Sequence, residues 1–285
     1  MAWAGQLTLD YKHAQGRTTA LDRHDGPLRV LRALYPEGEG ICHHVLVHPP
    51  GGIVGGDSLD IQVDVRSGAH ALLTTPGATR FYRSAGPAAR QDLVARVADG
   101  ARLEWLPLET LVHDAARATN TMRFELAPGG QMIGSDLLAL GLPASQQPYA
   151  CGCFDQRIEV DDVWMERGRL DFEDPAQAAL TRRLLASPLG WARRSVLGLL
   201  WFATGSELPR EQVEALLESA REVLPESRPD APLLAGATAP HPRVVLVRVL
   251  AHRTEPAQEL MRELRHRWRT LTWGLPRVSP RVWNT

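Results

Sequence analysis

A glycine-rich segment, residues 48–57, is the most unusual stretch of the chain that could carry chemistry. It reads His-Pro-Pro-Gly-Gly-Ile-Val-Gly-Gly-Asp. A phosphate-binding loop needs Lys and then Ser or Thr after its last glycine, so that an ammonium group and a hydroxyl reach phosphate and magnesium. Asp57 stands there instead, and its carboxylate would repel phosphate. Because no strand followed by a long helix surrounds these glycines, the dinucleotide fingerprint fails as well. The segment therefore indicates a tight backbone path.

Asp57 is the first candidate for metal chemistry. It shares the parity of the apolar residues Leu59, Ile61, Val63 and Val65, so its carboxylate is expected on the apolar side of a strand. A buried carboxylate needs a partner. Three arrangements remain open for Asp57: backbone N–H groups of the adjacent glycines satisfy the carboxylate, the carboxyl group is protonated, or it lines a wet cavity that a cation can enter. We favour the first of these three.

Three histidines, at positions 43, 44 and 48, flank Cys42 and invite a metal-site interpretation, because imidazole suits nickel and zinc. On a strand, His44 and His48 would share one face and His43 would lie on the other. The three rings are therefore expected to be separate core or surface histidines.

The other residues with metal-binding or acid–base chemistry lack a supporting pattern. Cys151 and Cys153 form one close pair, whereas structural zinc sites use two such pairs, and no H-E-x-x-H motif occurs. Glu104 and Glu109 flank Pro107, which is expected to interrupt strand pairing with a bulge or bend. The two carboxylates could act as general acid and base, yet no nucleophile or histidine lies at an interpretable spacing. Two further acidic candidates are Asp114 and Asp136.

The elements that would position these residues are short strands between about residues 59 and 160. Apolar and polar residues alternate at 59–66 and 122–127, and more weakly at 92–97. Each of these strands runs into a glycine turn, and Gly68, Gly100 and Gly130 lie 32 and 30 positions apart. This period predicts strand pairs stacked as rungs. An ordinary sandwich with evenly spaced hairpins is the alternative.

After Asp171 the pattern changes to helices. Asp174-Pro175 reads as an N-cap followed by proline at the first helical position. We predict a β-rich core over residues 1–170, and over 171–285 helical segments plus a returning strand at 243–252, packed on the same core as one domain. The expected elements of this second part are core helices at 178–185 and 191–202, a helix from Pro209, a surface loop at 228–242, a strand at 244–250, a helix at 255–268 and an extended tail from 273 to 285.

Composition excludes several function classes. The chain has 285 residues with 32 Lys and Arg against 33 Asp and Glu, so no global field recruits nucleic acid or an anionic membrane. Three cysteines form a poor disulfide framework, and no signal peptide or apolar segment of membrane-spanning length is found. We expect a cytoplasmic protein.

Six longer blocks follow one another in a fixed order, at residues 26–29, 35–38, 48–57, 74–84, 103–110 and 140–145. Together they resemble the UreD (UreH) family of urease accessory proteins. The resemblance is strong over about residues 16–160 and weaker beyond. Two departures are Leu108, where the family is expected to carry Gln, and His113, where an apolar aromatic residue is usual; neither removes a carboxylate.

The resemblance implies a mainly β fold of β-helical character with appended α-helices in the C-terminal part. It implies a non-catalytic scaffold that binds the helical protein UreF and, through it, the GTPase UreG, and that docks on apo-urease. It also implies a water-filled passage through which nickel travels in transit, with no tightly bound cofactor. The residues expected to line or guard that path are Asp57, Ser84, Glu109 and Asp136.

Two other functions remain open on the sequence. One is a metal-dependent hydrolase that uses Asp57, Glu109 and nearby histidines, which would retain a tightly bound metal ion. The other is a β-rich interaction module unrelated to metal.

Overall fold

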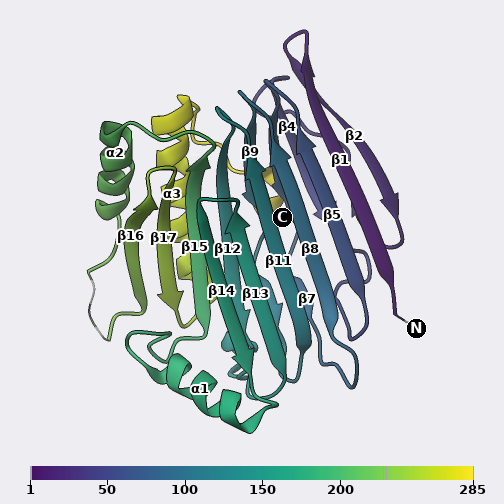
Figure 1. The fold of residues 1–285 in the computed structure, drawn as a ribbon, viewed down its shortest axis with the longest axis vertical. Coiled ribbons are helices and arrows are strands. Elements are labelled where there is room, and N and C mark those ends of the chain that lie inside the picture. Colours follow the sequence, from purple (N-terminus) through teal and green to yellow (C-terminus); the bar gives the residue numbers. More distant parts are fainter. Residues whose placement is uncertain (1, 227, 229, 285) are drawn as a thin grey trace.

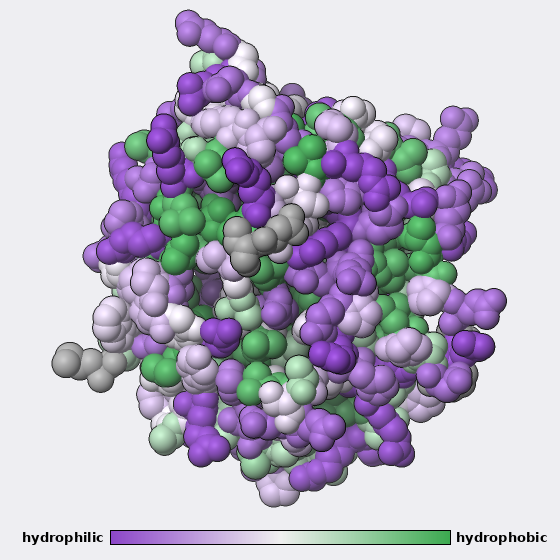
Figure 2. Space-filling view, turned by 180° about the vertical axis from the view of Figure 1, so that it is seen from behind, coloured by the Kyte–Doolittle hydropathy of each residue, from purple (hydrophilic) through white to green (hydrophobic). Residues whose placement is uncertain are grey.

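Two β-sheets lie face to face, and helices cover the outer surface of one of them (Figure 1). The structure is a computed structural model, and it describes all residues except 1, 227, 229 and 285. One apolar core fills the space between the sheets, and a second lies between the larger sheet and the helices. Seen from behind the view of Figure 1, hydrophilic side chains spread over most of the surface, with separate groups of hydrophobic ones among them (Figure 2).

The smaller sheet has seven strands in the order β14-β13-β11-β8-β5-β1-β2. Its central strands β5, β8, β11 and β13 run parallel. The strands of this sheet are β1 (Ala4–Ala14), β2 (Arg17–Asp25), β5 (Ser58–Val65), β8 (Ala89–Val97), β11 (Arg117–Leu126), β13 (Cys153–Val160) and β14 (Trp164–Asp171).

The larger sheet has ten strands, eight of them in the order β16-β17-β15-β12-β9-β6-β4-β3, while β10 pairs with β12 and β7. Its strands are β3 (Arg29–Val30), β4 (Ile41–Val47), β6 (His70–Thr74), β7 (Thr79–Phe81), β9 (Arg102–Leu106), β10 (Thr110–Val112), β12 (Gln131–Leu140), β15 (Val196–Thr204), β16 (Leu233–His241) and β17 (Val244–Ala251). The helices are α1 (Pro175–Ala186), α2 (Arg210–Arg221) and α3 (Thr254–Trp273), with 3-10 turns at Pro143–Ser145 and Arg281–Asn284.

The predicted stacked rungs are confirmed. Each of β5, β8 and β11 crosses through a tight turn to β6, β9 and β12 of the other sheet, and equivalent strands of successive rungs pair in parallel. Gly68, Gly100 and Gly129 occupy the left-handed position of these turns, with φ of 72°, 68° and 77°. The third turn glycine is therefore Gly129 and not Gly130, whose own conformation is ordinary.

The predicted alternation is also confirmed on β5, where the odd-numbered residues from Leu59 to Val65 are buried and the even-numbered ones half-buried. The buried side faces the opposite sheet. The outer side carries cross-strand ion pairs, of which Arg96–Glu125 and Arg123–Asp161 are examples.

Two predictions for the C-terminal part are wrong. The predicted core helix 191–202 is largely strand β15, which lies in the middle of the larger sheet between β12 and β17. Leu199 and Trp201 pack into the core between the sheets, while Leu200 and Phe202 pack under the helices. Because both faces of β15 are buried, its sequence shows no alternation.

The predicted surface loop 228–242 contains strand β16, which pairs with β17 at the edge of the larger sheet. Its small, uncharged residues gave no strand signal, and Pro240 is tolerated because the ladder shifts register between Thr238 and His241. Position 229 lies outside the described residues.

The predicted helices α1 and α2 and the predicted strand β17 are confirmed. Asp174 caps α1 by accepting a hydrogen bond from the Gln177 N–H at 2.9 Å. Helix α3 is longer than predicted and ends at Trp273, because Gly274 adopts the left-handed conformation with φ of 64°.

Candidate functional site

A cavity of about 280 Å³ lies between the two sheets. Strands β5, β8 and β11 line it from one side, and Trp105 of β9 and Asp136 of β12 line it from the other. Residues 75–80, which follow β6 and include the start of β7, also line it, and several of them are exposed, so the cavity reaches the surface there.

A row of amide side chains runs across the inner face of the smaller sheet beside this cavity. Gln91, Asn120 and Gln156 occupy matching positions on β8, β11 and β13, each directly paired with the next. The Gln91 Nε2 donates to Asn120 Oδ1 at 3.1 Å, and the Gln156 Nε2 donates to Asp136 Oδ2 at 2.6 Å. The row therefore brings polar groups into an otherwise apolar core, and it ends at the carboxylate on the opposite sheet.

Asp136 is the carboxyl group that lines this cavity, together with the ionisable side chains of His48 and Arg80, and its side chain is almost completely buried. Burial raises its pKa to about 6, and the hydrogen bond from Gln156 opposes this shift in part. The carboxyl group is therefore largely ionised at neutral pH but close to its titration point.

The cavity has room for water beside its polar groups. The buried Trp105 Nε1 has no hydrogen-bond partner among the described residues, although Trp105 lines the cavity. Buried polar groups almost always find a partner, and a cavity of this volume can hold an ordered water molecule at the polar part of its mostly apolar lining.

Gln156 also lines a second cavity, of about 160 Å³, beside β14 and α1. The hydrogen bond between Gln156 and Asp136 thus joins the linings of the two cavities.

The four residues predicted for a nickel path lie at different places, and Asp136 alone among them lines the large cavity. Asp57 is buried and accepts hydrogen bonds from the N–H groups of Trp3 at 2.8 Å and Val54 at 3.0 Å. The preferred interpretation, that backbone N–H groups satisfy Asp57, is thus confirmed, although neither donor is a glycine.

Ser84 lies at the same end of the molecule as Asp57. Its hydroxyl donates to the Pro87 carbonyl at 2.6 Å, and a Cβ on Gly55 would lie 2.1 Å from Ser84 Oγ. Glu109 lies elsewhere, half-buried at the start of β10, where its charge faces Arg262 of α3.

The predicted separation of the histidines is confirmed. His43 Nε2 pairs with Glu37 Oε1 at 2.8 Å, and His44 Nδ1 hydrogen-bonds to the Tyr11 hydroxyl at 2.8 Å. His48 lines the large cavity, and burial lowers its pKa. No three His, Cys, Asp or Glu side chains converge on a metal site within the part of the chain that the structure describes.

The three cysteines are free thiols, of which Cys42 is buried, Cys151 exposed and Cys153 half-buried. Burial raises the pKa of Cys42 to about 11, so this thiol stays protonated at neutral pH.

Comparison with known proteins decides the family. The family model described as "UreD urease accessory protein" matches residues 4–284. The urease accessory protein UreD of Methylibium petroleiphilum is 59% identical to this chain, and that of Leptothrix cholodnii is 54% identical, each over 100% of both chains. The chain belongs to the UreD family. A third relative, the UreD protein of Paracidovorax citrulli, is 52% identical over 99% of both chains.

Membership in the UreD family supports a role in urease maturation. It also extends the resemblance to the C-terminal third, where the sequence blocks were weakest. No helix among the described residues is long and apolar enough to cross a membrane.

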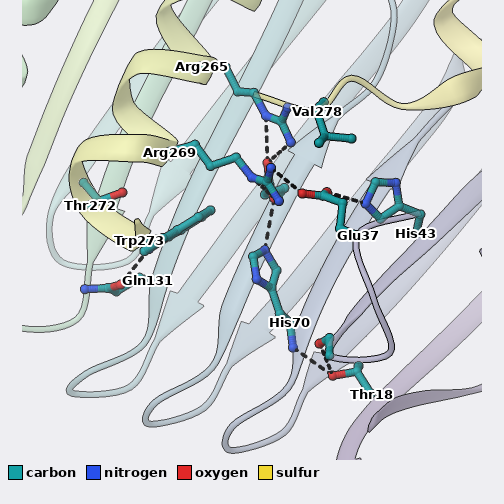
Figure 3. Close-up of polar contacts among 12 residues, drawn as sticks. Thr18, Glu37, His43, His70, Gln131, Arg265, Arg269, Thr272, Trp273 and Val278 are labelled. Carbon is teal, nitrogen blue, oxygen red and sulfur yellow. Dashed lines mark hydrogen bonds and ion pairs between the residues drawn. The ribbon is translucent and has the colours of Figure 1, made fainter. Parts of the chain in front are cut away.

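A buried charge cluster of this UreD-family chain was not among the predictions made from the sequence (Figure 3). Glu104 is fully buried, and its carboxylate accepts hydrogen bonds from His70 Nε2 at 3.0 Å, Arg265 Nε at 2.8 Å and Arg269 Nε at 3.0 Å. Arg269 Nη1 also pairs with Glu37 Oε2 at 2.6 Å. Two carboxylates and two guanidinium groups thus balance in the interior, and the surrounding cations hold the pKa of Glu104 well below its usual range.

One signal could have revealed the cluster. Arg265 and Arg269 are four residues apart on one helix face, but the predicted helix ended at residue 268. The cluster ties α3 to β6, to β9 and to the loop that holds Glu37, and its charges are already paired, so its role is structural.

Proposed function

We propose that this chain is a non-catalytic scaffold of urease maturation that assembles with UreF and the GTPase UreG on apo-urease. We further propose that it helps convey nickel to the urease active site and that it works in the cytoplasm. Membership in the UreD family supports the first part. The observation that supports conveyance is the interior cavity with Asp136 and the amide row beside it.

The chemistry of this cavity suits a cation in transit. One carboxylate, amide oxygens and water offer Ni²⁺ a few hard oxygen ligands, whereas a complete set of histidines and cysteines would bind it tightly. An ion that must leave again needs such weak binding. A carboxyl group with a pKa of about 6 is mostly charged at neutral pH, so it attracts the divalent ion. Its single negative charge balances only half of the charge of Ni²⁺.

Asp57, Ser84 and Glu109 have a smaller place in this proposal, at the approaches to the cavity. Asp57 and Ser84 adjoin the loop whose residues Gly51, Gly52 and Ile53 line it, and Glu109 directly precedes the lining residue Thr110. Their oxygens would attract the ion before or after it passes Asp136.

Co-expression tests the scaffold part. We expect the tagged chain to co-purify with UreF and with apo-urease, and urease produced without this chain to hold much less nickel. A soluble, folded chain that associates with neither protein would contradict the proposal. A stoichiometric metal ion that survives dialysis, together with hydrolytic activity, would instead favour the hydrolase.

A further inference from the structure

Helix α1 turns large apolar side chains toward solvent. Its inner face carries buried Ala178 and Thr181 together with half-buried Leu185. On the neighbouring face, Leu180 and Leu184 are 53% and 40% exposed. An ordinary amphipathic helix buries its leucines and exposes small and polar residues, so core packing does not explain this arrangement.

The turn after α1 extends the apolar face. Leu189 is 99% exposed, yet the segment around it is held by backbone hydrogen bonds from Trp191 N–H to the Leu184 carbonyl and from Arg193 N–H to the Leu185 carbonyl. Ala192 and Arg193 both adopt positive φ, of 48° and 61°. A strained, hydrogen-bonded turn that presents a leucine to solvent is typical of a functional surface.

The second cavity opens beside this face. It has a volume of about 160 Å³ and is lined mainly by apolar side chains, among them Phe154, Trp191 and Leu199. Leu184 and Arg167 also line it and are exposed, so the cavity reaches the surface next to the leucines. It has room for an apolar side chain from outside, as in the anchor pockets of protein interfaces.

The unpaired charge beside the face is positive, because Glu166, which lines the second cavity, is already paired with Arg248. Arg183 lies in the last turn of α1 and Arg193 in the strained turn, and both are exposed without an acidic partner in the described structure. The acidic residues Glu173 and Asp174 lie at the opposite end of the helix, where Glu173 pairs with Arg117 and Asp174 caps α1.

We propose that the outer face of α1, made of Leu180, Leu184, Leu189, Arg183 and Arg193, is a docking surface for a partner protein. The partner presents an acidic segment with at least one large apolar side chain. That side chain enters the second cavity, and the acidic groups meet the two arginines. The cavity favours a protein over a lipid surface, because a specific pocket needs one projecting group whereas a membrane needs only area.

Gln156 connects the proposed docking surface with the proposed nickel path. Gln156 lines the second cavity and hydrogen-bonds to Asp136 of the large one, so the docked partner would sit where the interior comes closest to this end of the molecule.

The first test compares the full-length chain with Leu180→Glu/Leu189→Glu and Arg183→Glu/Arg193→Glu, with Leu271→Glu as control. Leu271 is 50% exposed on α3 and thus matches Leu180 in exposure. The probes, purified apo-urease and UreF, rest on the proposed function. We expect both double variants to bind one of these proteins at least roughly tenfold more weakly, with unchanged circular dichroism, because interface anchors weaken binding to this extent. Equal binding by wild type and all variants would overturn the docking surface.

A second probe separates this inference from the proposed function. It is a synthetic helical peptide of alternating glutamate and leucine turns, titrated by fluorescence anisotropy. Wild type and Leu271→Glu should bind it, and the two double variants should not, even if wild type binds neither urease nor UreF and the proposed function fails. Absence of peptide binding to wild type would overturn the inference. So would co-sedimentation of wild type with anionic phosphatidylglycerol vesicles that the double variants abolish, since the face would then be a lipid surface.

Discussion

A single carboxyl group, that of Asp136, lines the interior cavity. Its neighbours are amides and apolar side chains, and the nearest donor is Gln156 at 2.6 Å. The loss of water around the buried carboxyl group has the largest effect on its pKa and raises it. This balance distinguishes Asp136 from Glu104, which is buried as deeply but is surrounded by two guanidinium groups.

Asp136 makes the stability of the chain depend on pH. Its pKa is raised from 3.8 to about 6 by folding, so the folded protein holds a proton that the unfolded chain releases between these values. The stabilisation is complete below about pH 4 and is lost as the pH rises through about 6. The Asp136→Asn variant has no carboxyl group to ionise, so it does not lose this stabilisation as the pH rises. Its free energy of unfolding should therefore exceed that of wild type above about pH 6 by on the order of 2–3 kcal/mol.

Urea unfolding of both proteins at about pH 4 and about pH 7 measures this difference. A difference between variant and wild type that is the same at both values would show that Asp136 has an ordinary pKa.

The residues that the sequence could identify are those with a local signal. Asp174 was predicted as a cap from its neighbour Pro175, and Asp57 was placed on the buried side by parity alone. Asp136 was an acidic candidate without a supporting pattern, and its place on a nickel path came from the family resemblance, because nothing around it in sequence marks a cavity. No sequence pattern indicated Gln156, because its hydrogen-bond partner Asp136 lies on the opposite sheet.

At the scale of elements, the pattern of burial decided what could be predicted. Strands β5, β8 and β11 have one buried and one wet face, and their alternation predicted them. Strand β15 is buried on both faces and was predicted as a helix, while β16 consists mostly of small uncharged residues after its two leucines. The rung period was visible because each turn needs a glycine with positive φ.

The contact between β12 and β15 leaves no room for a side chain at Gly134. An added Cβ would lie 2.1 Å from the Trp201 ring, which is itself fully buried. We expect Gly134→Ala to lower the free energy of unfolding by about 1–3 kcal/mol, because the ring must leave its preferred position.

Gly168→Ala is the matched control, because Gly168 also lies on a strand and an added Cβ there meets nothing within 4 Å. Thermal unfolding of the two variants should separate them clearly. Equal melting temperatures would mean that the interior can rearrange around Gly134.

Helix α3 is joined to the sheets through the charge cluster. Removal of one charge, in Glu104→Gln, leaves two buried guanidinium groups with Glu37 as the one remaining carboxylate of the cluster. Breaking a buried ion pair in this way destabilises a protein by about 3–5 kcal/mol. Hydrogen exchange should show the loss first in α3 and in the tail that Arg265 and Arg269 hold through the carbonyls of Val278 and Pro276.

The control for this prediction is Glu214→Gln, which breaks the exposed pair with Arg210 on α2. Its unfolding midpoint should match that of wild type, because exposed pairs contribute little. If Glu104→Gln and Glu214→Gln unfold alike, the cluster does not hold the helix. The sequence could indicate the two arginines on one helix face but not their partner, since Glu104 and Arg269 are 165 positions apart.

At the scale of the whole molecule, the proposed function gives the interior and the exterior separate tasks. Two sheets enclose the cavity with Asp136, and α1, with the proposed docking surface, lies outside them (Figure 1). Stacked rungs suit this division, because matching positions on β8, β11 and β13 add one amide each to the inner row while other side chains of the same strands point outward.

The nickel content of purified urease, matured in cells with wild type, Asp136→Asn or Asp64→Asn, tests the central claim most directly. Asp64 lies on the outer face of β5, and Asp136→Asn is expected to be more stable than wild type at neutral pH, so misfolding cannot imitate the effect. At equal assembly of the complex, we expect several-fold less nickel with Asp136→Asn and a wild-type content with Asp64→Asn. Equal nickel in all three samples would contradict conveyance through this cavity.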